Sequence, residues 1–139
     1  MDPGENGGLR GPFVGTSAIV VRDGLVLMGR RRGAVGAGEW AFPGGAVDPG
    51  EDPAATAARE LLEETGLIAT TVAPAVWTSA TFPDAGTHWI TLHHRIEASG
   101  EPLRTEPDKV EGWTWVRWDA LPRPLFAPVV ELLAMGWAP

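Results

Sequence analysis

Residues Gly45 to Leu67 read GAVDPGEDPAATAARELLEETGL, a segment in which two helix-boundary signals enclose regularly spaced acidic residues. Asp52 is typical of a helix N-cap, and Pro53 is typical of the first helical position. Gly66 is typical of the residue just past a helix C-terminus. The segment therefore predicts one helix that begins at Pro53 and ends before Gly66.

Three acidic residues fall on one face of this helix. At about 100° per residue, Glu60, Glu63 and Glu64 point to the same side. Like charges four residues apart weaken a helix, so a bound cation would offset their repulsion. Carboxylate oxygens suit Mg²⁺ or Mn²⁺. A second face can pack on a core, and it contains Ala54, Ala58, Leu61 and Leu62.

The spacing of the whole segment is more specific than an acidic helix face alone. The order G-x5-E-x7-R-E-U-x-E-E-x-G-U, with U a bulky apolar residue, is complete from Gly45 through Glu51 and Arg59 to Leu67. This pattern resembles the Nudix box. An isolated E-x-x-E-E would be better explained as a solvated helix face, but the fixed spacing of the full pattern argues against that alternative here.

The resemblance implies roles for individual residues. Arg59 would orient the carboxylates, and Glu51 would brace the preceding loop by pairing with Arg59. Gly44 has no Cβ, so backbone there can approach a ligand closely. The implied ligands of Mg²⁺, with Mn²⁺ as a substitute, are the carbonyl of Gly44 and the carboxylates of Glu60, Glu63 and Glu64.

The implied reaction is attack of water on a phosphorus of a nucleoside diphosphate linked to a further group X. For a triphosphate, the products are a monophosphate and pyrophosphate. A divalent cation would neutralise phosphate charge and make the attacking water more acidic. The implied catalytic residues are Arg59, Glu63, Glu64 and Glu111, and the general base is left open between Glu63 and Glu111.

Length and composition limit the class of protein. The chain has 139 residues, a formal net charge of −7 and no cysteine. We expect one domain over residues 12–139, after a flexible, polar and glycine-rich tail over residues 1–11. The acidic charge argues against a protein that binds a nucleic-acid duplex, which needs a basic surface. Neither a membrane span nor a signal peptide is visible, so we expect a cytoplasmic protein without a membrane partner.

Strand patterns flank the predicted helix, and a second helix closes the chain. The predicted strands cover residues 16–21, 25–28, 39–42, 72–82, 87–98 and 112–118, and the second helix covers residues 128–135. This order favours an α/β class with a mixed sheet between helices. The resemblance is what names it as a Nudix-type α/β/α sandwich.

Several residues outside the box are candidates for substrate contact. Arg31, in a basic and glycine-rich loop, is a candidate for phosphate because guanidinium groups pair well with phosphate. Phe126 is a candidate for stacking on a base, with the alternative that it anchors a helix. His88, His93 and His94 lie on one predicted strand without the partner pattern of a zinc site, so we do not predict zinc.

The similarity extends beyond the box, over roughly residues 15–131. GRRRGAVGAGEWAFPGG, THWITL and EPDKVEGWTWVRWDALPRPLF are similar to the MutT-like branch that hydrolyses nucleoside triphosphates. Within it, Thr91 and Phe126 match positions near the base pocket, purines are the favoured bases, and a homodimer is expected. Pro83 instead resembles ADP-ribose hydrolases, which keeps ADP-ribose and nucleotide sugars as alternative substrates. A nucleotide-sensing domain without catalysis is the alternative of another class, and the complete box argues against it.

Overall fold

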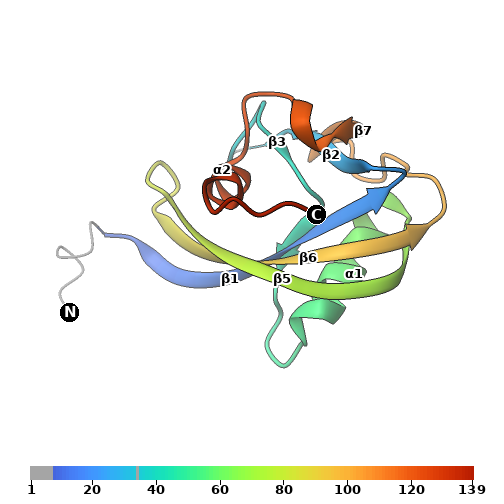
Figure 1. Ribbon diagram of the computed structural model, residues 1–139. Coiled ribbons are helices and arrows are strands. Elements are labelled where there is room, and N and C mark those ends of the chain that lie inside the picture. Colours follow the sequence, from blue (N-terminus) through green and yellow to red (C-terminus); the bar gives the residue numbers. More distant parts are fainter. Residues whose placement is uncertain (1–7, 34) are drawn as a thin grey trace.

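The computed structural model describes residues 8–33 and 35–139, in which a seven-stranded mixed sheet lies between two helices. The strands are β1 (Arg10–Arg22), β2 (Leu25–Arg31), β3 (Trp40–Ala41), β4 (Gly44–Ala46), β5 (Ile68–Phe82), β6 (Thr87–Ser99) and β7 (Val110–Arg117). The helices are α1 (Pro53–Thr65), α2 (Ala127–Ala134) and the short 3-10 helix η2 (Trp118–Ala120). Helices α1 and α2 cover opposite faces of the sheet (Figure 1), which confirms the predicted α/β/α architecture.

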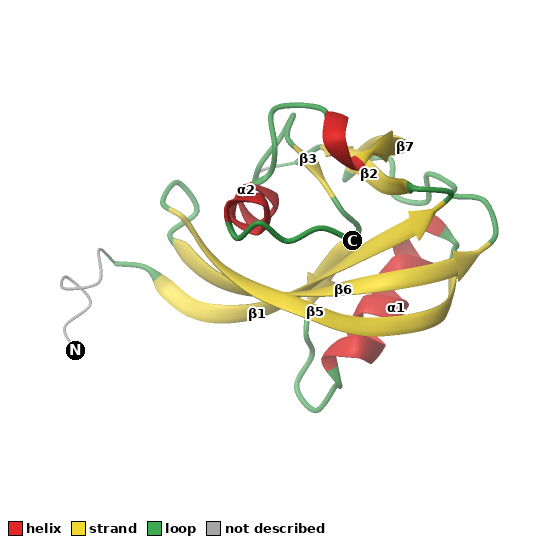
Figure 2. Cartoon of the chain, in the orientation of Figure 1, coloured by secondary structure: helices red, strands yellow, loops and turns green. Residues whose placement is uncertain are grey.

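The long strand β1 organises the sheet. It runs parallel to β6, pairs antiparallel with β4 in its middle and pairs antiparallel with β2 near its end. Among the described strands, β5 pairs with β6 alone and forms one edge of the main strand order β3-β2-β1-β6-β5. Figure 2 shows how the curved sheet wraps around the start of α2. The resulting concave face is where the candidate site lies.

Strand β1 carries both halves of the core because successive side chains point to opposite faces. Ala18 and Val20 pack with Ala57, Leu61 and other residues on the α1 side. Ile19 belongs to the second cluster, on the α2 side, with members that include Val129 and Leu132. Burying one such aliphatic side chain contributes about 1.5–3 kcal/mol. Helices α1 and α2 therefore pack against opposite faces of the same strand.

Helix α1 has the predicted bounds but a different buried face. Its buried residues are Thr56, Ala57, Leu61 and Thr65. Leu62, which we expected on the core side, is 51% exposed. The row of Ala57, Leu61 and Thr65 at intervals of four faces the sheet, and Leu62 lies about 100° away from it. Asp52 is the N-cap residue, but its side chain makes no capping hydrogen bond.

The structure also differs from the sequence prediction in strand bounds: β2 extends to Arg31, which we placed in a loop, and β5 begins at Ile68 rather than at residue 72. Strand β1 begins at Arg10, so it includes residues that we assigned to an N-terminal tail, and residues 1–7 lie outside the described part of the chain. Strand β4 was not predicted, because Gly44 and Gly45 have little strand propensity. Its pairing with β1 places these glycines beside Ser17 and Thr16. None of the described helices has the length and hydropathy needed to span a membrane.

Candidate active site

The acidic residues of α1 differ in their surroundings. The side chain of Glu63 is 54% exposed and that of Glu60 is 18% exposed. Glu64 is half-buried, and its Oε2 accepts a hydrogen bond of 2.8 Å from the N–H of Gly44. The carboxyl group of Glu60 occupies the space that a Cβ on Gly45 would fill. The two glycines thus allow the β4 backbone to lie directly against the acidic face.

Burial leaves the charge of this face poorly compensated. It raises the pKa of Glu64 to about 8, against a smaller opposing effect of the Gly44 N–H, and the charge of Glu60 raises it further. Burial also raises the pKa of Glu60, partly offset by the charge of Arg59. A group that brings positive charge would stabilise both carboxylates in their ionised form.

Arg59 holds the predicted pairing with Glu51. Its Nε and Nη2 donate to the two carboxylate oxygens of Glu51 at 2.8 and 3.0 Å, a bidentate arrangement. The hydrogen bond from Arg59, assisted by one from Thr56, lowers the pKa of Glu51 to about 2. Nη1 of Arg59 also donates to Glu60 at 3.0 Å and to Glu63 at 3.2 Å. Arg59 therefore connects the loop before α1 to the acidic face.

The loop before β7 contributes an acid that the sequence reasoning missed. Glu111 does not line the cavity at the acidic face; its Oε2 instead pairs with Nε of Arg30 at 3.4 Å. Glu106 lines this cavity, and its charge raises the pKa values of both Glu60 and Glu64. Nζ of Lys109 lies 3.0 Å from Oε2 of Glu106, and Lys109 also lines the cavity. Glu106 lies in the loop and Glu111 is the second residue of β7, and the sequence offered no means of choosing between them.

A cavity of about 700 Å³ extends from the acidic face across the sheet to the start of α2. Arg31, Thr91 and Phe126, our three candidates for substrate contact, all line it together with Gly44, Glu60 and Glu64. Glu63 is not among the lining residues. The structure thus brings residues from all seven described strands and from α1 and α2 to one space that is large enough for a nucleotide.

The sheet forms a polar floor in this cavity. His93 is 2% exposed, and its two ring nitrogens lie 2.6 Å from the hydroxyl of Ser17 and 2.8 Å from that of Thr78. Burial lowers the pKa of His93 to about 4, so its ring is neutral at pH 7. Thr91 lies on the same face two residues earlier in β6. The alternation along β6 indicated this shared face, but only the fold placed Ser17 beside His93.

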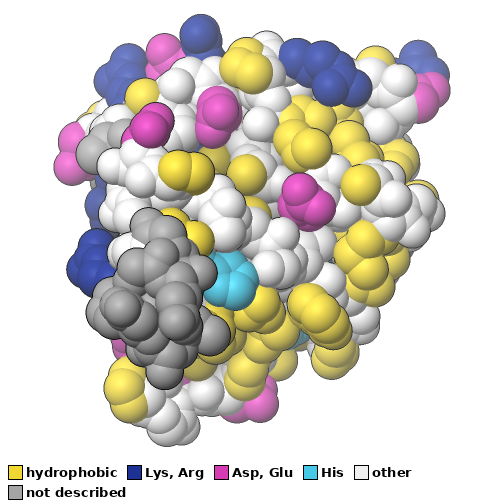
Figure 3. Space-filling model, turned by 90° about the vertical axis from the view of Figure 1, so that its left-hand side faces the viewer, with side chains coloured by type: hydrophobic (Ala, Val, Ile, Leu, Met, Phe, Trp, Pro, Cys, Tyr) yellow, Lys and Arg dark blue, Asp and Glu magenta, His cyan; other side chains and the backbone are white. Residues whose placement is uncertain are grey.

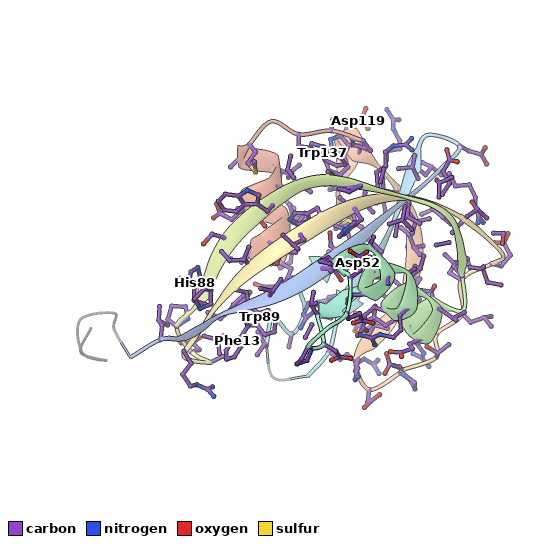
Figure 4. All side chains as sticks on the ribbon, turned by 90° about the horizontal axis from the view of Figure 1, so that it is seen from below. Phe13, Asp52, His88, Trp89, Asp119 and Trp137 are labelled. Atoms are coloured by element: carbon purple, nitrogen blue, oxygen red, sulfur yellow. The ribbon has the colours of Figure 1, made fainter. Side chains whose placement is uncertain are left out.

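Aromatic rings also line the cavity, and Arg31, which lies on one of them, is near enough to Glu64 for the two charges to interact. Trp89, which the sequence analysis did not name, lies beside Phe13 (Figure 4) and lines the cavity. The centroids of the two rings are 5.2 Å apart. Phe126 and Phe82 also line the cavity, with centroids 5.3 Å apart. The guanidinium carbon of Arg31 lies 4.0 Å from the centroid of the Phe126 ring. Trp89 shares its strand face with Thr91 and His93, and this alternation could have identified it.

The acidic end has the donor chemistry of a magnesium site without a complete cage. Among the described residues, no three His, Asp or Glu side chains form a ready-made cluster for a metal ion. Mg²⁺ usually takes one or two carboxylates, several waters and substrate phosphates, so a full protein cage is not required. Glu60 and Glu64 are half-buried, and burial raises the pKa of both although Arg59 pairs with Glu60, so they fit that partial ligand set.

Comparison with known proteins gives a consistent family. The model of the NUDIX domain matches residues 11–134. The crystal structure of a MutT NUDIX hydrolase from Burkholderia pseudomallei superposes with a TM-score of 0.82 and 35% identity, covering 89% of this chain and 98% of that one. An RNA pyrophosphohydrolase from Acidiphilium cryptum is 29% identical over 88% of this chain and 87% of its own length.

Other relatives match over shorter stretches. The oxidized purine nucleoside triphosphate hydrolase of Danio rerio is 46% identical over 57 residues, which are 41% of this chain and 36% of that protein. This chain likewise covers 42% of the Nudix hydrolase 25 of Arabidopsis thaliana. This chain thus spans less than half the length of these two relatives.

Proposed function

The chain belongs to the Nudix hydrolase family, and we propose that it hydrolyses nucleoside triphosphates, purines first, to a monophosphate and pyrophosphate. It is a pyrophosphohydrolase of nucleotide-type substrates, and enzymes of this family generally use divalent metal ions. The choice of triphosphates is supported by the relative named as a hydrolase of oxidized purine nucleoside triphosphates. The net charge of −7 favours a free nucleotide over an RNA end as substrate.

One observation carries the proposal: a single cavity joins the acidic face of α1 to a floor of threonine, serine and aromatic side chains. Phosphates next to bound cations would lie at Glu60 and Glu64. The nucleoside would then extend toward Thr91 and Trp89, where hydroxyl groups and a ring can recognise a base. Arg31 lines the same cavity and is our candidate for a direct phosphate contact.

The residues of the site have two different roles, metal binding and the orientation of the metal ligands. Glu60 and Glu64, together with Glu63 and the Gly44 carbonyl, would hold Mg²⁺ or Mn²⁺. When bound, the metal neutralises phosphate charge and makes water more acidic. Arg59 keeps the carboxylates oriented through its bonds to Glu51 and Glu60. Catalysis would come largely from this positioning and charge stabilisation.

We propose Glu106 as a proton acceptor beside the earlier candidate Glu63. Glu106 lines the cavity and lies close enough to Glu60 and Glu64 to shift their pKa values. Glu111, the other acid considered for this role, is engaged with Arg30 outside the cavity lining. A proton acceptor has to reach the attacking water, so position favours Glu106.

The test is a hydrolysis screen with Mg²⁺ over nucleoside triphosphates, dinucleoside polyphosphates, nucleotide sugars and ADP-ribose. We expect the highest kcat/KM for a purine nucleoside triphosphate, with release of pyrophosphate. ADP-ribose or a nucleotide sugar is the second candidate, because Pro83 opens the β5–β6 turn and Ala85 of that turn lines the cavity. A higher kcat/KM for either of these would reject the triphosphate assignment.

We also propose a homodimer. Strand β5 lies at an edge of the sheet, and none of its 15 residues is charged. Its Trp77 is 60% exposed, and Phe13 on β1 is 40% exposed. Figure 3 shows hydrophobic side chains spread over the face that carries the start of β1. Sedimentation velocity tests this proposal, and a monomer at all concentrations would reject it.

A further inference from the structure

Arg31 is fixed inside the cavity by contacts of its backbone and of its guanidinium group. It is the last residue of β2, and its backbone N–H donates to the carbonyl of Glu39 at 2.8 Å. Its Nε donates to the carbonyl of Val35 at 3.1 Å. The guanidinium carbon lies 4.0 Å from the centroid of the Phe126 ring. The side chain is therefore held both by a hydrogen bond and by an aromatic face.

The Phe126 ring is itself held in place. Its backbone N–H donates to the carbonyl of Trp40 at 2.9 Å, and the residue is the N-cap of α2. Phe82 lies against the ring with a centroid distance of 5.3 Å. Gly36 approaches so closely that a Cβ there would lie 2.7 Å from a ring carbon of Phe126. These neighbours leave Phe126 poorly placed to stack on a base.

The Phe126 ring stabilises the positive charge of Arg31 in a site that is partly shielded from water. Burial lowers the pKa of Arg31, although the charges of Glu64 and Glu39 oppose this effect. A cation over an aromatic face gains more when both are shielded from water. Among the described residues, Nη1 and Nη2 of Arg31 have no hydrogen-bond partner, and these two nitrogens can donate to a phosphate in a bidentate manner.

We propose that Phe126 is a positioning residue that holds the guanidinium of Arg31 against the polyphosphate chain of the substrate, rather than a platform for the base. This inference rests on the proposed function and deepens it. It predicts that Phe126 affects the binding of any polyphosphate, with or without a nucleoside. A base-stacking residue would affect only ligands that carry a base.

The decisive probe is inorganic tripolyphosphate, which has phosphates but no base. Its Kd is measured by calorimetry with Mg²⁺ for the wild type, Arg31→Gln, Phe126→Leu and the double variant. Phe126→Leu keeps apolar volume and removes the aromatic face, and Phe126→Tyr keeps that face. Trp137→Leu is the matched control, because Trp137 packs on Trp118 and does not line the cavity.

We expect Phe126→Leu to weaken tripolyphosphate binding by about three- to tenfold, with Phe126→Tyr and the control close to wild type. In the Arg31→Gln background, Phe126→Leu should add no further loss, because the ring acts through the guanidinium. The ratio of kcat/KM between purine and pyrimidine triphosphates should not change in Phe126→Leu.

Two results with the variants would overturn the inference. One is tripolyphosphate binding that is unchanged in Phe126→Leu while base discrimination is lost. The other is full additivity of the two substitutions. Failure of the proposed function is a separate outcome: the wild type would then bind tripolyphosphate with the expected dependence on Phe126 but hydrolyse no triphosphate. If the wild type binds no tripolyphosphate, the inference itself is rejected.

Discussion

Replacing Glu64 by glutamine should raise the stability of the metal-free protein and remove most of its activity. Glu64 ionises in the unfolded chain above about pH 4.5, but burial raises its pKa to about 8 in the fold. The fold therefore binds a proton that the unfolded chain has released, and this group destabilises the fold increasingly as the pH rises from 4.5 to 8.

The size of the effect follows from these pKa values. At pH 7 the solution is about 2.5 units above the ordinary pKa, and each unit corresponds to about 1.36 kcal/mol. The cost removed by Glu64→Gln is thus at most about 3 kcal/mol. The amide oxygen of glutamine can still accept the hydrogen bond from the N–H of Gly44. Denaturant unfolding in EDTA at pH 7 measures this gain.

The same substitution should be costly for catalysis, because the metal needs the negative charge rather than the shape. Loss of a metal ligand is expected to raise the barrier by about 3–5 kcal/mol, or about 10²–10⁴-fold in kcat. The matched control is Glu131→Gln, an exposed acid on α2, which should change neither quantity. Near wild-type turnover of Glu64→Gln at saturating Mg²⁺ would refute the metal assignment.

Three further predictions concern other parts of the site. Millimolar Mg²⁺ should raise the Tm, because the cation binds the acidic face only in the folded protein. EDTA should abolish activity. A Tm that does not change with the Mg²⁺ concentration would contradict this prediction. Glu106→Gln should lower kcat by about 10²-fold or more while Glu111→Gln has little effect, and the reverse order in steady-state kinetics would exclude Glu106 as proton acceptor. The stability of the wild type relative to His93→Gln should rise with pH between about 4 and 6.5, because the unfolded chain binds a proton that neutral, buried His93 does not. Denaturant unfolding across this range would show a constant difference if the pKa of His93 were unshifted.

Local patterns were sufficient for α1 and its acidic residues. The proline and glycine at its ends act within one turn, and the spacing of Glu60, Glu63 and Glu64 depends only on helical geometry. The pairing of Arg59 with Glu51 also links residues close in sequence. The buried face was less predictable: Leu62 is exposed because the sheet selects the row through Ala57 and Leu61.

Strand boundaries were also hard to predict from the sequence, because they depend on partner strands that are distant along the chain. Strand β4 forms because its glycines lie against Ser17 and Thr16 of β1, and β1 extends back to Arg10 because β6 provides a partner there. Neither partner is adjacent in sequence. Hydrogen bonds between strands that are distant along the chain therefore determine where β4 and the start of β1 form, although their residues have low strand propensity.

The sequence by itself determined the chemistry of this protein: an unbroken set of acids, an arginine and glycines at fixed local intervals, which defines a Nudix hydrolase. The tertiary structure alone decided which residues share the cavity. It brought Glu106 rather than Glu111 to the acidic face, placed Ser17 beside His93, and laid Arg31 on Phe126. The reason is physical: helical spacing acts over a few residues, whereas these contacts join strands and loops that only the packing of the sheet and both helices brings together.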